Sequence, residues 1–297
     1  MKNPLLLTLS LLGGWLSLGC DEPLKSVELV VEQRVLGARV EVTGDAGRAA
    51  PAPGESASVT LLVAAPQLDR ALGFALAACS AAPRDGSRSA CASPPFSQVS
   101  SPNAQAASPS LSFDVPADFD PSGRLAVLGV ICPGGSPSAD GTSCDGSAPG
   151  TPVQLELELA HDGDVNLNPE LQPDSIKFDD GVWPELPAVD GDCTGLGFPE
   201  LPVNSRHSIA VQLDESDRDP LPRASSIDPA RESLQLSHFT TAGDLSRAFE
   251  SIAWDSQELR RLVSWTAPRQ VGLVRFWLVL RDFRGGGAFV ERAVCVQ

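Results

Sequence analysis

Residues 271–281 read VGLVRFWLVLR, and this stretch decides the fold class. Large apolar side chains alternate from Val274 to Leu280, and the positions between them are also largely apolar. A short apolar run with this alternation predicts a β-strand that is buried on both faces. The glycine-rich segment 284–287 follows as a turn, and the apolar segment 288–296 is predicted to return as the hairpin partner.

The same pattern extends outward along the chain. Residues 153–159 alternate Val and Leu with Gln and Glu, which is typical of a half-buried antiparallel strand. The Ser-, Ala- and Pro-rich stretch 80–110 is predicted to be a loop, and short helical turns are expected at 244–251 and 256–262. The other strands are expected at 27–31, 36–42, 59–65, 72–79, 111–115, 124–132, 175–178, 206–213, 233–239 and 262–265.

This density of short strands indicates an all-β protein. Gly and Pro number 26 each, which suits many turns and few long helices. We predict two immunoglobulin-like β-sandwich domains, the first over residues 27–160 and the second over 176–297. The polar stretch 161–175, which contains two prolines, is predicted to be the linker.

The N-terminus carries the pattern of an export signal. Residues 1–19 combine a charged start, a short apolar run and a small residue at the end. Cys20 follows, as in a bacterial lipobox, where the cysteine receives a diacylglycerol and becomes the first mature residue; Ser17 stands where that motif usually has Leu or Val. We therefore predict a lipid-anchored envelope protein with residues 20–26 as its tether, at the outer membrane or cell surface rather than the inner membrane. An ordinary cleaved signal or an uncleaved anchor is the alternative.

The remaining cysteines predict a disulfide framework. The chain has seven cysteines, and setting Cys20 aside leaves an even number in an exported chain. The spacing favours the pairs Cys79–Cys91, Cys132–Cys144 and Cys193–Cys295. The main alternative joins Cys79 to Cys132.

Charge and motifs exclude several function classes. The formal net charge is −16, and no basic patch with interleaved aromatic residues is present, so nucleic acid is a poor partner. The sequence contains no G-x-S-x-G, H-E-x-x-H, P-loop or dinucleotide motif. We therefore predict no enzymatic activity and no cofactor.

One weak metal candidate lies in the linker. Asp162, Asp164 and Asn166 follow the spacing of a calcium-binding loop. Leu167 and Pro173 occupy the positions where an EF-hand needs Gly and Glu, so this is not an EF-hand. The alternative interpretation is a solvated acidic linker.

Three aromatic residues are candidates for contact or chemistry. Trp183 precedes Pro184 in a predicted loop and is the candidate for an exposed binding residue. His207 and His238 lie on apolar faces of predicted strands. They either meet to hold a metal or supply a base, or they are hydrogen-bonded structural histidines.

Several segments of the second half resemble uncharacterised surface lipoproteins of myxobacterial type. The resemblance covers most of residues 160–297 and, less specifically, 57–134. It implies exported immunoglobulin-like modules of the cell envelope and carries over no catalytic residue. The segments are Asn168–Pro169, Leu234–Phe239, Thr241–Gly243, Val263–Pro268, Phe276–Asp282, Arg284–Gly286 and Ala293–Val296.

These observations together predict a structural or binding module. Its partners are expected to be the membrane, through lipidated Cys20, and an envelope protein or glycan. The alternative is an accessory subunit of an envelope machine for secretion, motility or surface assembly.

Overall fold

The computed structural model describes most of the chain after residue 25. The predicted signal segment, Cys20, and the calcium candidates Asp162 and Asp164 lie outside the described residues. The described residues are 26–66, 72–82, 89–104, 108–120, 122–146, 149–160, 165–185, 193, 197–221 and 230–297.

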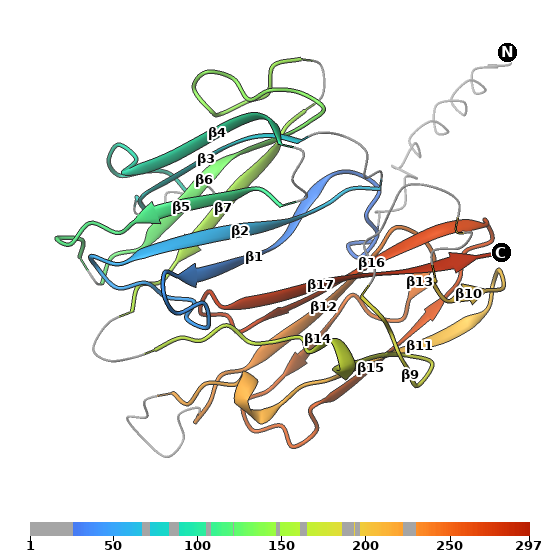
Figure 1. Cartoon of the computed structure of the whole chain (residues 1–297). Helices are drawn as coiled ribbons and strands as arrows, with labels where there is room; N and C mark the ends of the chain where they lie inside the picture. Colours follow the sequence, from blue (N-terminus) through green and yellow to red (C-terminus); the bar gives the residue numbers. More distant parts are fainter. Residues whose placement is uncertain are drawn as a thin grey trace, which may run out of the picture.

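Strands of the first half form two antiparallel sheets (Figure 1). One sheet has the order β1-β2-β5 and the other has the order β4-β3-β6-β7. Their facing side chains, Leu61, Leu76 and Val127 among them, form one apolar core. The strands are β1 Arg34–Val42, β2 Ser56–Ala64, β3 Leu72–Ser80, β4 Ser97–Ala104, β5 Ser110–Asp114, β6 Leu125–Pro133 and β7 Thr151–Leu157.

The second half is a larger sandwich of two five-stranded sheets. Their orders are β10-β17-β16-β12-β14 and β13-β15-β11-β8-β9. Trp183, Trp265 and Phe276 lie in the core between them. The strands are β8 Ile176–Phe178, β9 Gly181–Val182, β10 Glu200–Leu201, β11 Arg206–Gln212, β12 Leu234–Thr240, β13 Asp244–Leu245, β14 Phe249–Ile252, β15 Arg260–Thr266, β16 Gly272–Arg281 and β17 Gly287–Val296. Two single-turn 3-10 helices are η1 Pro173–Ser175 and η2 Glu215–Asp217.

The all-β, immunoglobulin-like prediction is confirmed, and so is the β16–β17 hairpin. Its register runs from Gly272 opposite Val296 to Arg281 opposite Gly287. The two faces of β16 have different neighbours, however. Phe276 and alternate residues face the core of the second sandwich, whereas Trp277 and its alternates face the first sandwich. The continuous apolar pattern therefore records contact between the two halves of the molecule as well as the sandwich core.

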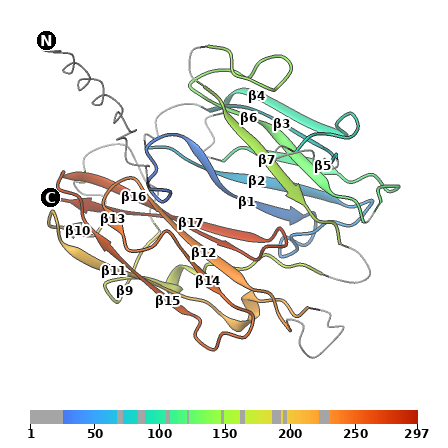
Figure 2. The same ribbon diagram turned by 180° about the vertical axis from the view of Figure 1, so that it is seen from behind.

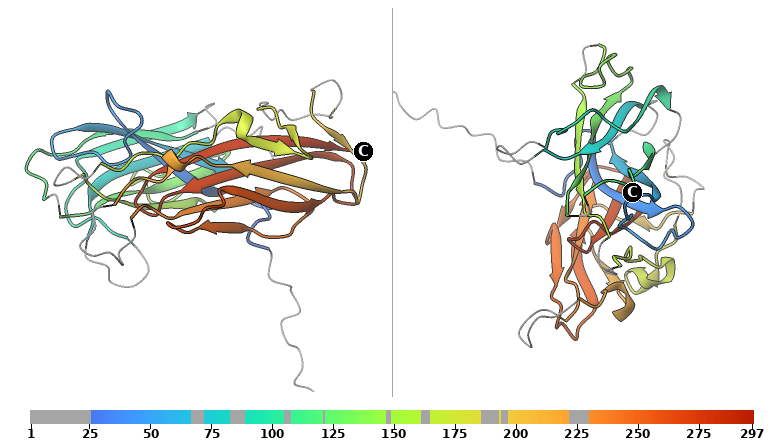
Figure 3. Two further views of the ribbon diagram at one scale, coloured as in Figure 1. Left: turned by 90° about the horizontal axis from the view of Figure 1, so that it is seen from below. Right: turned by 90° about the vertical axis from the view of Figure 1, so that its left-hand side faces the viewer.

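The two halves pack side by side, with β1 next to β17 (Figures 1 and 2). Their strands run in roughly the same direction, which gives an elongated molecule (Figure 3). The halves meet through a separate group of buried apolar residues, which we call the interface cluster. It consists of Val30, Leu36, Leu62, Ala64, Trp277 and Val279.

Residues 27–31, expected to be a strand of the first sandwich, form no regular strand. Leu29 makes an isolated parallel bridge with Thr240 of β12, in the second sandwich. The Val30 N–H donates to the Thr240 carbonyl at 2.8 Å, and the Thr240 N–H donates to the Glu28 carbonyl at 2.9 Å. Alternation predicts extended chain but cannot say which sheet edge receives it.

Three local predictions were wrong. Residues 97–104, expected to be loop, form β4, because the backbone pairs with β3 although the side chains lack an apolar period. The helical turns expected at 244–251 and 256–262 are absent from these fully described segments, which contain β13, β14 and the start of β15. In each case backbone pairing with a neighbouring strand overrides a weak local signal.

The disulfide prediction is confirmed in all three pairs. The Cα–Cα distances are 5.6 Å, 5.5 Å and 5.4 Å, within the normal range for a disulfide. The first two bonds close short loops that leave β3 and β6, and the third ties a loop to the last strand. The pairs are Cys79–Cys91, Cys132–Cys144 and Cys193–Cys295.

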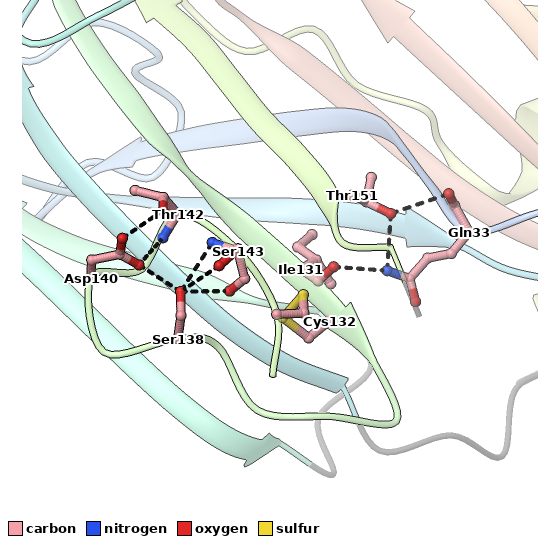
Figure 4. The surroundings of a disulfide bond; sticks show 9 residues. Gln33, Ile131, Cys132, Ser138, Asp140, Thr142, Ser143 and Thr151 are labelled. Carbon is pink, nitrogen blue, oxygen red and sulfur yellow. Dashed lines mark hydrogen bonds between the residues drawn. A yellow bond between two sulfur atoms is a disulfide. The ribbon is translucent and has the colours of Figure 1, made fainter. Parts of the chain in front are cut away.

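Figure 4 shows how one of these loops is held at the end of the first sandwich. Beside Cys132, the Gln33 side-chain amide donates to the Ile131 carbonyl at 3.4 Å and to Thr151 Oγ1 at 3.2 Å (Figure 4). These bonds connect the chain entering β1 to β6 and β7.

Within the described part of the chain, no helix has the length and apolar character needed to cross a bilayer.

Candidate functional site

The structure buries Trp183, so the expectation of an exposed binding residue was wrong. Its side chain is 1% exposed and packs edge-on against Phe276 with ring centroids 5.1 Å apart. The indole Nε1–H donates to the Ala293 carbonyl at 3.1 Å. The Trp183 backbone N–H also bonds to the Ile176 carbonyl, which directs the side chain into the core immediately after β9.

The two candidate histidines lie on different sheets and have different surroundings. His238, on β12, is 1% exposed, and burial lowers its pKa to about 4, so its imidazole is neutral at physiological pH. His207, on β11, has hydrogen-bonding partners of its own. Among the described residues, no group of three or more His, Cys, Asp and Glu is arranged to hold a metal ion.

His207 lies between a serine and an aspartate. Its Nδ1 is 2.5 Å from Asp179 Oδ2, and its Nε2 is 2.6 Å from Ser205 Oγ. The ring stacks on Phe178, with centroids 5.2 Å apart and planes inclined by 26°, and its side chain is 10% exposed. This places a hydroxyl, an imidazole and a carboxylate in one connected row.

Asp179 is held in place by the hairpin that contains it. It occupies the two-residue turn between β8 and β9, where Asp179 and Asp180 have φ angles of 48° and 65°. Its carboxylate also accepts the Ser208 backbone N–H at 2.8 Å. Burial favours the neutral acid, but hydrogen bonds with His207 and Ser208 outweigh it and lower the pKa of Asp179.

Ser205 lies in a tight turn that precedes β11. Its backbone N–H donates to the Pro202 carbonyl at 3.3 Å, and Asn204 has a φ of 57°. The Ser205 hydroxyl contacts the Pro202 carbonyl as well as His207. The turn lies beside the C-terminus, because Val203 N–H donates to the Gln297 carbonyl (Figure 1).

Sequence reasoning found His207 but did not connect it with the other two residues. Ser205 and His207 are two positions apart on extended chain, so their side chains share a face, and this signal was available. Asp179 precedes them by more than 25 positions, and only the pairing of β8 with β11 brings it to the histidine.

A second polar group lies at the joint between the halves; we call it the polar node. All its members are at least nine-tenths buried. Burial raises the pKa of Glu232 to about 7, and the nearby negative charges of Asp282 and Asp219 add to this shift. Arg284 opposes it. The polar node consists of Asn166, Asn168, Asp219, Glu232 and Asp282.

Asn166 is the one calcium candidate that falls within the described residues, and it is 2% exposed. Burial raises the pKa of the neighbouring Asp282 carboxyl group, and the Asn166 side chain is one of the groups that oppose this shift. The neighbouring Leu167 N–H donates to Asp219 at 2.6 Å. Asn166 is therefore buried at the joint, although its neighbours Val165 and Leu167 are exposed.

A shallow groove of about 660 Å³ lies beside the same joint. Its walls come from β1, β7 and the β16–β17 hairpin. The exposed ring of Phe283 stands at its edge, 64% exposed. Residues lining it include Leu36, Ala38, Val153, Leu155, Arg281 and Phe283.

Comparison with known proteins assigns neither a family nor a function to this chain. No protein-family model matches the chain. No curated protein matches it. Solved structures with similar arrangements of β-strands exist. The class of immunoglobulin-like β-sandwich proteins is assigned from the two pairs of packed sheets described above.

Three of these solved structures illustrate how distant the similarity is. The adhesin InvE of Yersinia pseudotuberculosis is 10% identical, with a TM-score of 0.21 and coverage of 86% of this chain and 58% of that chain. Trypsin-activated alpha-2-macroglobulin of Escherichia coli is 9% identical, with a TM-score of 0.23 and coverage of 89% and 18%. A glycosyl hydrolase family 2 member of Bacteroides cellulosilyticus is 9% identical, with a TM-score of 0.21 and coverage of 82% and 23%. This chain therefore spans less than two thirds of each.

Proposed function

We propose that this protein is a lipid-anchored module of the cell envelope that acts as a rigid structural or binding element. The observation that carries the proposal is the joint between the two sandwiches. Domains in one chain usually move relative to each other unless their interface is large and apolar. Here the halves are connected by the interface cluster, the polar node and an added backbone bridge, so both sandwiches present their loops in one fixed arrangement.

Two arginines reinforce the joint from the second sandwich. The Arg275 side chain is 5% exposed, donates to the Ala65 carbonyl at 2.9 Å, and lies over Trp277 with 4.7 Å from its Cζ to the ring centroid. Arg281 donates to the Leu36 carbonyl. These bonds reach backbone groups of the first sandwich, so they fix orientation as well as contact.

The disulfides and the N-terminal sequence support an extracytoplasmic location. Disulfides persist in oxidising compartments, and this chain has three of them. In the proposal, lipidated Cys20 holds the module on a membrane, at the outer membrane or cell surface. Loops at the ends of the sandwiches and the groove beside the joint receive an envelope protein or a glycan.

The test is the intact mass of protein extracted from membranes, with and without reduction, beside a Cys20→Ala variant. We expect a chain that starts at Cys20, carries lipid and gains six protons on reduction, and we expect Cys20→Ala to leave the membrane fraction. An unlipidated chain with free thiols contradicts the proposal. A stable complex that co-purifies with the anchored protein would instead assign it as an accessory subunit of an envelope machine.

A further inference from the structure

We propose that Ser205 is an activated nucleophile that accepts acyl groups from small, solvent-exposed esters, with His207 as its base and Asp179 as the group that orients the base. This activity goes beyond the proposed envelope module and differs from the sequence-based expectation of no enzymatic activity. It would add slow acyl chemistry to the structural or binding role proposed above.

The connectivity of the three side chains is the first argument. A serine nucleophile needs an imidazole nitrogen within hydrogen-bonding distance, and the other nitrogen must bond to an orienting group. Ser205 Oγ is 2.6 Å from Nε2 of His207, and Nδ1 is 2.5 Å from Asp179 Oδ2. In the tautomer that carries hydrogen on Nδ1, this hydrogen is donated to the Asp179 carboxylate and the lone pair of Nε2 faces the serine hydroxyl.

The second argument is that the base is held rigidly. The His207 ring stacks on Phe178 and lies 6.1 Å from the ring of Trp265, and both of those residues belong to the sandwich core. Asp179 is fixed in turn by the Ser208 backbone N–H and by its place in the hairpin turn. Rigid placement avoids the entropic cost of assembling the three groups during the reaction.

The third argument concerns access and the class of substrate. Ser205 is partly exposed, and its neighbours Pro202 and Asn204 in the turn are exposed. The Ser205 hydroxyl is therefore reachable from solvent, away from the groove described above. An accessible serine of this kind suits a small acyl group on an exposed ester and gives little selectivity for the alcohol part.

The reaction balances without a cofactor. Oγ of Ser205 attacks the ester carbonyl carbon, and the hydroxyl proton passes to Nε2 of His207. The ester C–O bond breaks, and the departing alcohol takes that proton. Water then attacks the acyl-serine, gives its proton to Nε2, and releases the carboxylic acid as the proton returns to Oγ; the sum is an ester plus water giving an acid plus an alcohol.

The expected rate is modest for two reasons. The Ser205 hydroxyl also contacts the Pro202 carbonyl, and its single hydrogen serves only one acceptor at a time. A positioned base contributes about 10²–10⁴-fold, and each oxyanion donor that a site lacks costs about 10²–10³-fold. Formation of the acyl-serine or of a phosphonylated serine is therefore the sharper measurement, and turnover is a secondary one.

The experiment uses the folded, disulfide-bonded protein with p-nitrophenyl acetate and a fluorophosphonate probe. We expect one covalent adduct, located at Ser205 by peptide mass spectrometry. The adduct should be absent in Ser205→Ala and form roughly 100-fold more slowly in His207→Gln, which fills the same space but cannot take the proton. Ser264→Ala, on the adjacent strand β15 of the same sheet, is the matched control, and its Ser205 should be labelled at the same rate as in the native protein.

Two further measurements separate activation from a merely structural role. Circular dichroism and thermal unfolding should show that Ser205→Ala keeps the native fold, because it removes a single oxygen. Labelling should stay slow in His207→Gln although this variant keeps the native circular dichroism spectrum, a combination that a merely structural role of His207 would not produce. No adduct at Ser205, or equal labelling in His207→Gln and the native protein, would overturn the proposal. Neither result bears on lipid anchoring.

Discussion

The interface cluster and the polar node join the same two halves by opposite chemistry. The interface cluster is apolar and includes Trp277, which is fully buried. The polar node is also buried, but every bond in it is directional; Asn168, for example, donates to the Val40 carbonyl at 2.6 Å and accepts the Gly287 N–H at 3.0 Å. Apolar burial supplies most of the association energy, and satisfied polar groups select one orientation. The two patches should therefore respond differently to mutation and to pH.

The largest effect is expected from removing the centre of the interface cluster. Trp277→Ala should lower the free energy of unfolding by about 3–5 kcal/mol, because it leaves a large cavity and removes the surface on which Arg275 lies. Urea unfolding monitored by circular dichroism measures the loss. Val271→Ala on the same hairpin is the control, since Val271 is 71% exposed and should change stability by less than about 0.5 kcal/mol. Similar losses in both variants would show that the cluster does not hold the halves together.

The next effect concerns the disulfide that spans the second sandwich. Removing Cys193–Cys295, by replacing both residues with Ser, should cost about 2–4 kcal/mol, because the bond closes a loop with a sequence separation of 102. The double replacement of Cys79 and Cys91, with a separation of 12, is the comparison and should cost less in the chain-entropy model. Thermal unfolding of both variants under oxidising conditions measures the difference. A larger loss of stability on removing Cys79–Cys91 than on removing Cys193–Cys295 would show that loop entropy does not set the ranking of the two disulfides.

A smaller effect is expected within the polar node. Asn168→Ala removes both hydrogen bonds described above and leaves the Val40 carbonyl and the Gly287 N–H without the Asn168 side chain, at a cost of about 1–3 kcal/mol. Asn168→Asp is the informative companion, since it keeps the acceptor for Gly287 but loses the donor to Val40. Its stability should lie between those of the native protein and Asn168→Ala near pH 4, where the new carboxyl group is partly protonated. An unchanged free energy of unfolding in Asn168→Ala would show that these two hydrogen bonds do not stabilise the joint.

The smallest effect is a pH dependence that the interface cluster cannot produce. The pKa of Glu232 is raised from 4.5 to about 7, so the folded state holds a proton that the unfolded chain has lost. Its contribution to stability is therefore complete below about pH 4.5 and is lost as pH rises through about 7. Glu232→Gln should flatten this part of the stability profile by roughly 1 kcal/mol per pH unit between pH 5 and pH 7, measured in unfolding experiments. The same slope in Glu232→Gln and the native protein would assign the dependence to another group.

Particular residues show how far sequence patterns reach. The alternation in 271–281 and 153–159 predicted both strands, although β7 begins and ends two residues earlier than expected. The disulfide pairs followed from spacing, because twelve residues suffice to close a loop beside one strand end. By contrast, Trp183 was interpreted as a loop residue because it precedes a proline. Nothing in its local sequence indicated that its side chain packs into the core.

The candidate sites were less accessible to sequence reasoning than the fold. His207 was recognised from its place on an apolar face, but its role depends on Asp179, which arrives through the pairing of β8 with β11. Asn166 was chosen for its spacing to two aspartates, whereas the carboxyl group beside it, that of Asp282, comes from a hairpin more than 100 positions later.

The sequence by itself determined the all-β class and most strand positions and favoured the observed disulfide pairing, because alternation and spacing are local properties of the chain. It also contains the export pattern before Cys20, on which the proposed envelope location rests. Only the tertiary structure decided that residues 28–30 pair with β12, that Trp277 faces the other half, and that Ser205 meets His207. These facts depend on which strand edges and faces come together, and that choice is made by packing over the whole chain.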